Sequence, residues 1–296
     1  MIRAAVQKTG VLGLIGLAFL LGCGSLTESP SVIAGGSGAG NPGATVSLSM
    51  AVLITSAAAK TTAVAAPAKT VIDSCSSVTT SDQGGTSISL NNILLSGIII
   101  HFLVDSSDRP SDLLAAMHSR PANLSCDSNS IILAPAESFN ALSDSSGSGA
   151  SSILLPIARY SGVKLVFPQN TNSAQALEND TSGSQIVMNG TFPYAGQIHP
   201  LSVHIAYAQG PCSQTYSFAG GIFTLSSSDT THLELQFTAN QWFSAINVAT
   251  GLQNGDYAFD NCGALNFTNY SCQSSVAWTG ATVAADFLSS GKLTVY

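Results

Sequence analysis

Short segments in which apolar residues alternate with polar ones constrain the fold of this 296-residue chain more than any other feature. The clearest is 230–238, where Leu233, Leu235 and Phe237 are separated by polar residues. Thr45–Leu53 has the same pattern. Alternation with a period of two predicts strands with one buried face. Further strands are expected at 88–104 (two strands, or one bent at Gly97), 162–167, 185–192, 201–208, 215–225 and 292–296.

The scarcity of charge narrows the fold class. Only 8% of residues are charged, against about 25% in an average soluble domain. Long exposed helices, coiled coils and a basic nucleic-acid-binding surface are therefore excluded. We predict a mainly β, antiparallel β-sandwich, either one elaborated sandwich or two small ones. Segments 215–225 and 230–238 are expected to form a hairpin through the turn 226–229.

The N-terminus has the pattern of an export signal. Arg3 and Lys8 precede an uncharged apolar run, Val11–Leu21, which is shorter than the roughly 20 residues of a membrane-spanning helix. The run ends in Leu20-Leu21-Gly22-Cys23, which resembles the bacterial lipobox. That resemblance implies cleavage after residue 22 and acylation of Cys23. Gly24, where an Asp would signal retention, favours the outer membrane.

Four regions follow from this organisation: a signal peptide (1–22), the lipidated Cys23 with a Gly/Ser-rich tether (23–43), and two halves of the β region (44–168 and 185–296). Loss of Arg3 and Lys8 leaves seven basic against sixteen acidic residues, so the mature chain carries a net charge of −9. An acidic chain has no electrostatic attraction to anionic lipid or nucleic acid. We expect it to contact the bilayer through its acyl anchor alone.

Five cysteines remain after Cys23, and export favours disulfides among them. We expect Cys262 to pair with Cys272, which is close in sequence, and Cys75 with Cys126, which leaves Cys212 free. No pair has the CxxC spacing of a zinc or redox site.

Candidate binding chemistry is sparse. His204, His232 and Glu234 lie on polar strand faces and would form a two-His, one-carboxylate metal site if their strands were neighbours, although a solvated sheet face explains them more simply. Asp105, Asp108 and Asp112 offer oxygens to Ca²⁺ without the spacing of an EF-hand. Aromatic candidates for a sugar-binding platform are Trp242, Trp278, Tyr194 and Tyr257. Core filling explains Trp242 better, whereas Trp278 and Tyr257 lie in the loop-rich C-terminal part, where an exposed ring could contact a ligand.

Three segments carry a family resemblance: 87–102, 151–167 and 223–243. In the second, Tyr160, Val163, Leu165 and Phe167 follow a polar loop, and the third ends in the pair Trp242 and Phe243. The pattern resembles uncharacterised bacterial lipoproteins with an immunoglobulin- or transthyretin-like β domain. The resemblance implies the fold and the compartment, and it implies no reaction.

We therefore expect a lipid-anchored envelope protein with a structural or interaction role. The alternatives are a carbohydrate- or ligand-binding surface module and an accessory subunit of an envelope complex. No nucleophile elbow or phosphate-binding loop is present in the sequence, so we expect neither an enzyme nor a cofactor.

Overall fold

The computed structural model describes residues 43–53, 77–142, 151–169, 184–207, 211–226, 231–269 and 287–296. The signal peptide and the tether lie outside these residues. Among the residues described, no helix is long and apolar enough to cross a membrane.

Strands dominate this part of the chain and form two sheets. The smaller sheet has the order β14-β12-β1-β6, with bounds Gly291–Val295, Thr231–Thr238, Ala44–Leu53 and Ser151–Leu155. The larger has the main order β10-β7-β3-β8-β9-β13, with bounds Cys212–Ser217, Arg159–Phe167, Ser87–Val104, Ile186–Tyr194, Gln197–Ile205 and Leu265–Asn269. Four short or lateral strands extend it: β2 (Val78–Ser81) and β5 (Ser130–Asn140) on β3, β4 (Leu124–Cys126) on β5, and β11 (Phe223–Thr224) on β7.

The mainly β sandwich predicted from the sequence is confirmed. Most strand pairs are antiparallel, but β1 pairs with β12 and β9 with β13 in parallel. Strands from residues 44–168 and from residues 185–296 contribute to both sheets, because β12 lies beside β1 and β8 lies beside β3. The two sequence halves thus interleave, which favours one elaborated sandwich over two small ones.

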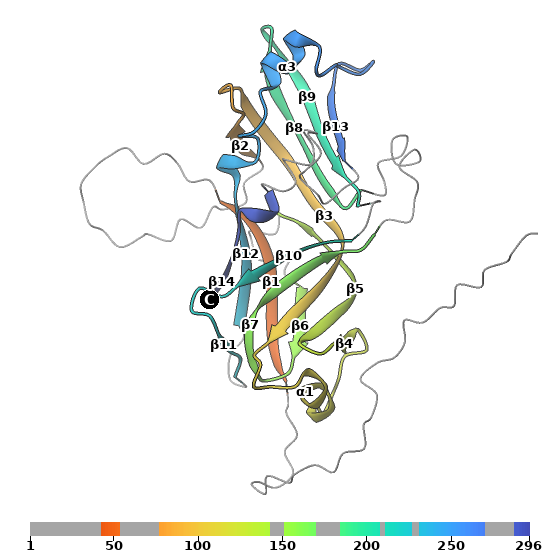
Figure 1. Cartoon of the computed structure of the whole chain (residues 1–296), viewed down its shortest axis with the longest axis vertical. Coiled ribbons are helices and arrows are strands. Elements are labelled where there is room, and N and C mark those ends of the chain that lie inside the picture. The colour runs from red at the N-terminus through yellow and green to blue at the C-terminus, as the bar shows by residue number, and fades with distance from the viewer. Residues whose placement is uncertain are drawn as a thin grey trace, which may run out of the picture.

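The 18-residue strand β3 organises the molecule along its long axis (Figure 1). At about 3.3 Å per residue it extends roughly 60 Å. Its first half pairs with β2 and β8, and its second half with β5 and β7. Gly97 has a φ of +67°, and the β3–β5 register shifts between Leu95 and Ile98. The bent-strand alternative is therefore the observed one, with a bulge that glycine accommodates.

We call the two ends of the molecule the base and the distal end. The base lies where β3 ends and α1 (Pro110–Ala116) follows; β1 begins there, because Ala44 pairs with Leu155 close to the β3–β7 end. The distal end carries the β8–β9 turn and α3 (Val248–Asn254) (Figure 1). The chain therefore enters the sandwich at the end opposite the β8–β9 turn.

Alternation of apolar and polar residues produces the core in the half of the molecule nearer the base, which we call the lower core. Leu233, Leu235 and Phe237 of β12 are at most 2% exposed, while the polar residues between them are half-buried. Each such aliphatic or aromatic side chain contributes about 1.5–3 kcal/mol on burial. The short 3₁₀ helix η3 (Ala239–Gln241) then leads Trp242 and Phe243 into the core, where both are fully buried. The segment thus closes one end of the lower core.

The predicted hairpin between 215–225 and 230–238 is wrong. β10 and β11 both pair with β7 in the larger sheet, whereas β12 pairs with β1 and β14 in the smaller sheet. The chain therefore crosses between the sheets at this point, and Phe237 of β12 meets Tyr216 of β10 edge to face, with ring centroids 6.2 Å apart. The edges of the two sheets meet at a bridge between Phe218, which follows β10, and Leu293 of β14.

Candidate functional site

The predicted metal site is not assembled. His204 lies on β9 in the larger sheet, and His232 and Glu234 lie on β12 in the smaller one. His204 Nε2 is 2.7 Å from the Ser202 hydroxyl, and His232 Nε2 is 2.9 Å from that of Ser49. No group of three His, Cys, Asp or Glu residues with metal-binding geometry occurs in the described part of the chain. The prediction is wrong because β9 and β12 are not neighbours.

The cysteines pair differently from the expectation. Cys262 is free and exposed, so the predicted Cys262–Cys272 disulfide is wrong. It lies in a tight turn whose backbone is held by Asp260, which accepts hydrogen bonds from the amides of Cys262 (2.8 Å) and Ala264 (2.9 Å). These bonds, with that of Ala264 as the largest cause, hold the pKa of Asp260 below its ordinary value.

Cys126 and Cys212 are both disulfide-bonded, so the expectation of a free Cys212 is wrong as well. Cys126 lies on β4 and Cys212 on β10, with β5, β3 and β7 between them. Strands are about 4.8 Å apart, so the two cannot bond to each other. Their partners are among the cysteines outside the described residues, and Cys75–Cys126 stays a prediction.

Tyr257 is not an exposed platform. Its half-buried ring packs against Gly251 of α3 and meets Phe267 edge to face, with ring centroids 5.3 Å apart. Trp278 lies outside the described residues, so its part in a sugar-binding platform stays a prediction. Tyr257 itself joins α3 to the larger sheet.

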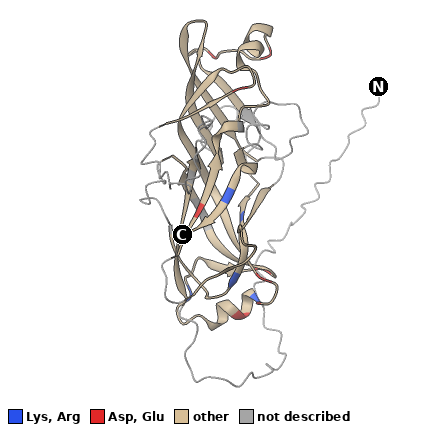
Figure 2. Ribbon diagram, turned by 90° about the vertical axis from the view of Figure 1, so that its left-hand side faces the viewer, with Lys and Arg blue, Asp and Glu red and all other residues tan. Residues whose placement is uncertain are grey.

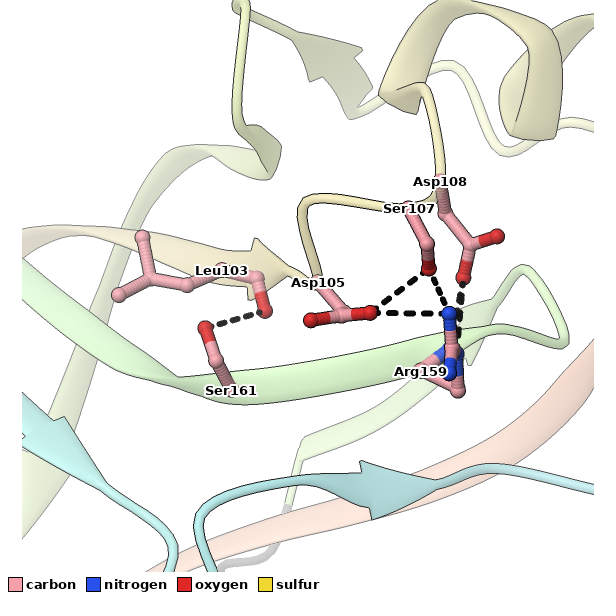
Figure 3. A network of polar contacts seen from close by, with 6 residues as sticks. All are labelled: Leu103, Asp105, Ser107, Asp108, Arg159 and Ser161. Atoms are coloured by element: carbon pink, nitrogen blue, oxygen red, sulfur yellow. Dashed lines mark hydrogen bonds and ion pairs between the residues drawn. The ribbon is translucent and has the colours of Figure 1, made fainter.

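The acidic loop at the base pairs with an arginine (Figure 3). Asp105 accepts a hydrogen bond from Ser107 (2.7 Å) and lies 3.0 Å from the Arg159 guanidinium. The Ser107 hydroxyl, with Arg159 as a smaller cause, holds the pKa of Asp105 below its ordinary value. Asp108 accepts a hydrogen bond from the Arg159 amide. Arg159 thus ties the loop to β7, and its guanidinium group pairs with the carboxylates that were candidate Ca²⁺ ligands.

A His of β3, the first Ser of β5 and an Asp of the turn before β5 meet, but not in the geometry of a catalytic triad. His101 Nδ1 is 2.9 Å from Ser130 Oγ and 3.5 Å from Asp127, and Ser130 donates its proton to Asp127. A triad needs the hydroxyl and the carboxylate on opposite ring nitrogens. Here both lie at Nδ1, and Ser130 is fully buried. The cluster is suited to fastening the turn before β5, and burial is the main cause that lowers the pKa of His101.

An apolar pocket of about 330 Å³ lies where the turn 218–223 meets residues 292–295 of β14. Its size is at the lower limit for small-molecule sites. Ile222 on its rim is 48% exposed. Lys292 and Thr294 are its only polar lining residues, so the pocket offers few groups that would select a ligand.

Charge is distributed unevenly along the long axis. Figure 2 shows the described Lys and Arg residues in the middle of the molecule and at the base. Residues 184–207 and 247–269, which build most of the distal end, contain no Lys, Arg or Glu, and their only Asp residues are Asp256 and Asp260. The distal end is therefore nearly neutral and slightly acidic.

Half-buried aromatic rings gather at this end. His199 stacks on Phe259 with centroids 4.4 Å apart, and Tyr194 lies 5.9 Å from Phe259. We call Tyr194, His199 and Phe259 the tip cluster; Phe192 lies beneath it, buried. His199 Nδ1 is 3.3 Å from the carbonyl of Gly263, which can only accept, so Nδ1 carries the proton. Ile198, on the same strand, is 68% exposed.

The sequence names Tyr194 as an aromatic candidate but does not predict the tip cluster as a group, because its members come from two distant segments. The β8–β9 hairpin turns tightly at Ala195 and Gly196, both with positive φ, and brings Tyr194 close to His199. Phe259 arrives 60 residues later and is fixed by its bridge to Leu265. An aromatic on each side of an Ala-Gly turn was the only local signal.

Comparison with protein-family models, with curated proteins and with solved structures found no match to this chain. The resemblance to lipoproteins with an immunoglobulin- or transthyretin-like domain therefore remains a prediction.

Proposed function

We propose that this chain is a lipid-anchored envelope protein, acylated at Cys23, whose sandwich is a non-enzymatic interaction module with its contact surface at the distal end. One observation carries the proposal. The chain enters the sandwich at the base, and the nearly neutral end with the tip cluster lies at the other end of β3, roughly 60 Å away. An anchor joined to the base would hold that surface farthest from the bilayer.

The chemistry of the distal end supports contact with a partner. Aromatic side chains with a polar tip are enriched where proteins recognise partners, because they bury much area with little loss of conformational freedom. The tip cluster supplies a tyrosine and a histidine of this kind, and the exposed Ile198 lies on the opposite face of the same hairpin. A glycan-binding surface is the second candidate, favoured by the lack of basic residues at this end.

The anchor is tested by metabolic labelling. Labelled palmitate is expected in the wild-type protein and absent from Cys23→Ala, with the outer-membrane fraction holding the labelled form, as Gly24 predicts. Label that persists in Cys23→Ala would contradict acylation at this residue.

The contact surface is tested by capture from detergent-solubilised envelope. Wild type is compared with Tyr194→Ala/Phe259→Ala at the distal end and with Arg109→Ala, an exposed residue at the base, as the matched control. A component retained by wild type and the control but lost with the distal variant supports the proposal. Equal retention by all three would contradict it.

A further inference from the structure

A row of uncharged polar side chains crosses four strands near the distal end. Asn92 of β3 lies opposite Asn189 of β8, which lies opposite Ser202 of β9, which lies opposite Asn266 of β13. Figure 1 shows β3, β8, β9 and β13 side by side. Opposite residues in neighbouring strands share a face of the sheet, so the four side chains form one row, which we call the amide row.

The amide row lies on the sheet face opposite the distal core. The residues that follow or precede its members, Ile93, Met188, Val203 and Phe267, are at most 4% exposed. Because side chains alternate between faces, the row points away from α3 and Tyr257. Asn92, Asn189 and Ser202 are half-buried, and Asn266 is exposed.

Hydrogen bonds fix the row and determine which of its atoms have no partner. Ser202 donates to the Asn189 carbonyl oxygen (2.5 Å), so His204 Nε2, 2.7 Å from Ser202 Oγ, must carry the proton and donate. Asn140 donates to the Asn92 carbonyl oxygen (3.2 Å). Asn266 donates to Asp260 (2.7 Å).

Three polar groups then remain available. Within the described residues, no hydrogen bond involves the side-chain amino groups of Asn92 and Asn189 or the side-chain carbonyl of Asn266. The hydroxyls of Ser89 and Thr191, opposite each other one row nearer the β8–β9 turn, add to them. Pro193, Ile198 and Pro200 continue the same face as an exposed apolar end.

This combination specifies the chemistry of a ligand. Fixed donors and acceptors without charge suit a ligand rich in hydroxyls, and an adjoining apolar surface suits its C–H face. The absence of Lys and Arg from β8, β9 and β13 gives no compensation for a buried phosphate, sulfate or carboxylate. We infer that the amide row is a binding site for an uncharged glycan. The inference rests on the proposed contact role of the distal end and adds the ligand class.

The test uses the mature, acylated chain in detergent on an array of neutral and anionic glycans, followed by calorimetry with the best neutral oligosaccharide. Asn92→Leu and Asn189→Leu keep the side-chain size and remove the amide. Each is expected to weaken binding on the order of tenfold, as loss of a hydrogen bond predicts. Asn254→Leu, at the exposed end of α3, is the control and should bind as wild type does. Thr191→Val, which removes only a hydroxyl, serves if a leucine variant does not fold.

Salt separates this site from a charged one. The affinity should stay unchanged between about 50 mM and about 500 mM salt. Salt in this range screens interactions between charges, and an uncharged ligand makes none. Binding to anionic glycans only, binding that falls steeply with salt, or binding unaffected by Asn92→Leu, Asn189→Leu and Thr191→Val would overturn the inference. A silent array with a protein captured through the tip cluster overturns the glycan site and leaves the proposed function standing. Silence in both experiments overturns both.

Discussion

Asp82 is predicted to hold the distal end in place. It lies in the turn between β2 and β3 and is 5% exposed. One carboxylate oxygen accepts the amide of Thr86 and the other accepts the buried amide of Val248, each at 2.7 Å. Val248 is the first residue of α3, so a single side chain joins the start of β3 to the segment that carries Tyr257 and Phe259.

Substitution of Asp82 should therefore cost more than an ordinary surface change. A hydrogen bond to a charged group contributes about 1.5–3 kcal/mol, and a buried donor left without a partner costs a similar amount. The Thr86 amide is partly accessible and regains water, whereas the Val248 amide is buried. We expect Asp82→Ala to lower the free energy of unfolding by about 3 kcal/mol. Asp82→Asn keeps one acceptor and should lose about 2 kcal/mol.

Urea unfolding of the anchor-free chain, residues 24–296 exported behind a cleavable signal, measures these values. Asp256→Ala is the control, because Asp256 is exposed next to α3 and should change the unfolding free energy by less than about 0.5 kcal/mol. Hydrogen exchange adds a local readout: the Val248 amide should lose protection in Asp82→Ala, while amides of β12 keep theirs. An unfolding free energy within about 0.5 kcal/mol of wild type in Asp82→Ala would refute the reasoning.

Three further predictions follow from separate features. Peptide mapping without reduction should find Cys126 and Cys212 in disulfides and Cys262 open to alkylation; a bridged Cys262 would contradict the pairing. Burial lowers the pKa of His204 below the ordinary 6.5, so the unfolded chain binds the proton more readily and the unfolding free energy should fall between about pH 7 and pH 5. His204→Gln should make the unfolding free energy, measured by urea titration, depend less on pH in this range. An unchanged pH dependence would contradict the role given to His204. A Cβ at Gly190 would lie 2.2 Å from the Ser89 carbonyl, so Gly190→Ala should cost about 1–3 kcal/mol; Gly220→Ala, with open space around it, should have little effect, and equal effects would contradict the close packing.

The sequence predicted the most regular strands well, because alternation decides which side chains face the core, but β2, β4, β5, β6 and β13 were not expected. β1 and β14 lie within one residue of their expected bounds, and Gly97 marks the bulge in β3. Local alternation does not specify the neighbour of a strand. The segment of β12 reads as half of a hairpin with the strand before it, but β12 pairs with β1 and β14 in the other sheet.

The same limit explains the site. The metal site depended on β9 and β12 being neighbours, and the Cys262–Cys272 disulfide depended on closeness in sequence alone. The tip cluster depends on the β8–β9 pairing and on Phe259, and the amide row depends on pairings between β3, β8, β9 and β13, which together join Asn92 to Asn266 across 174 residues of sequence. No local pattern identifies such pairings, so neither feature was accessible before the register was known.

Photo-crosslinking in intact cells tests most directly whether the distal end is the contact surface. A diazirine side chain is placed at Ile198, 68% exposed at the distal end, or at Ser111, exposed on α1 at the base. We predict that light produces a specific covalent adduct with an envelope component from position 198 and not from position 111. The same adduct from position 111, or adducts from position 111 alone, would contradict the account.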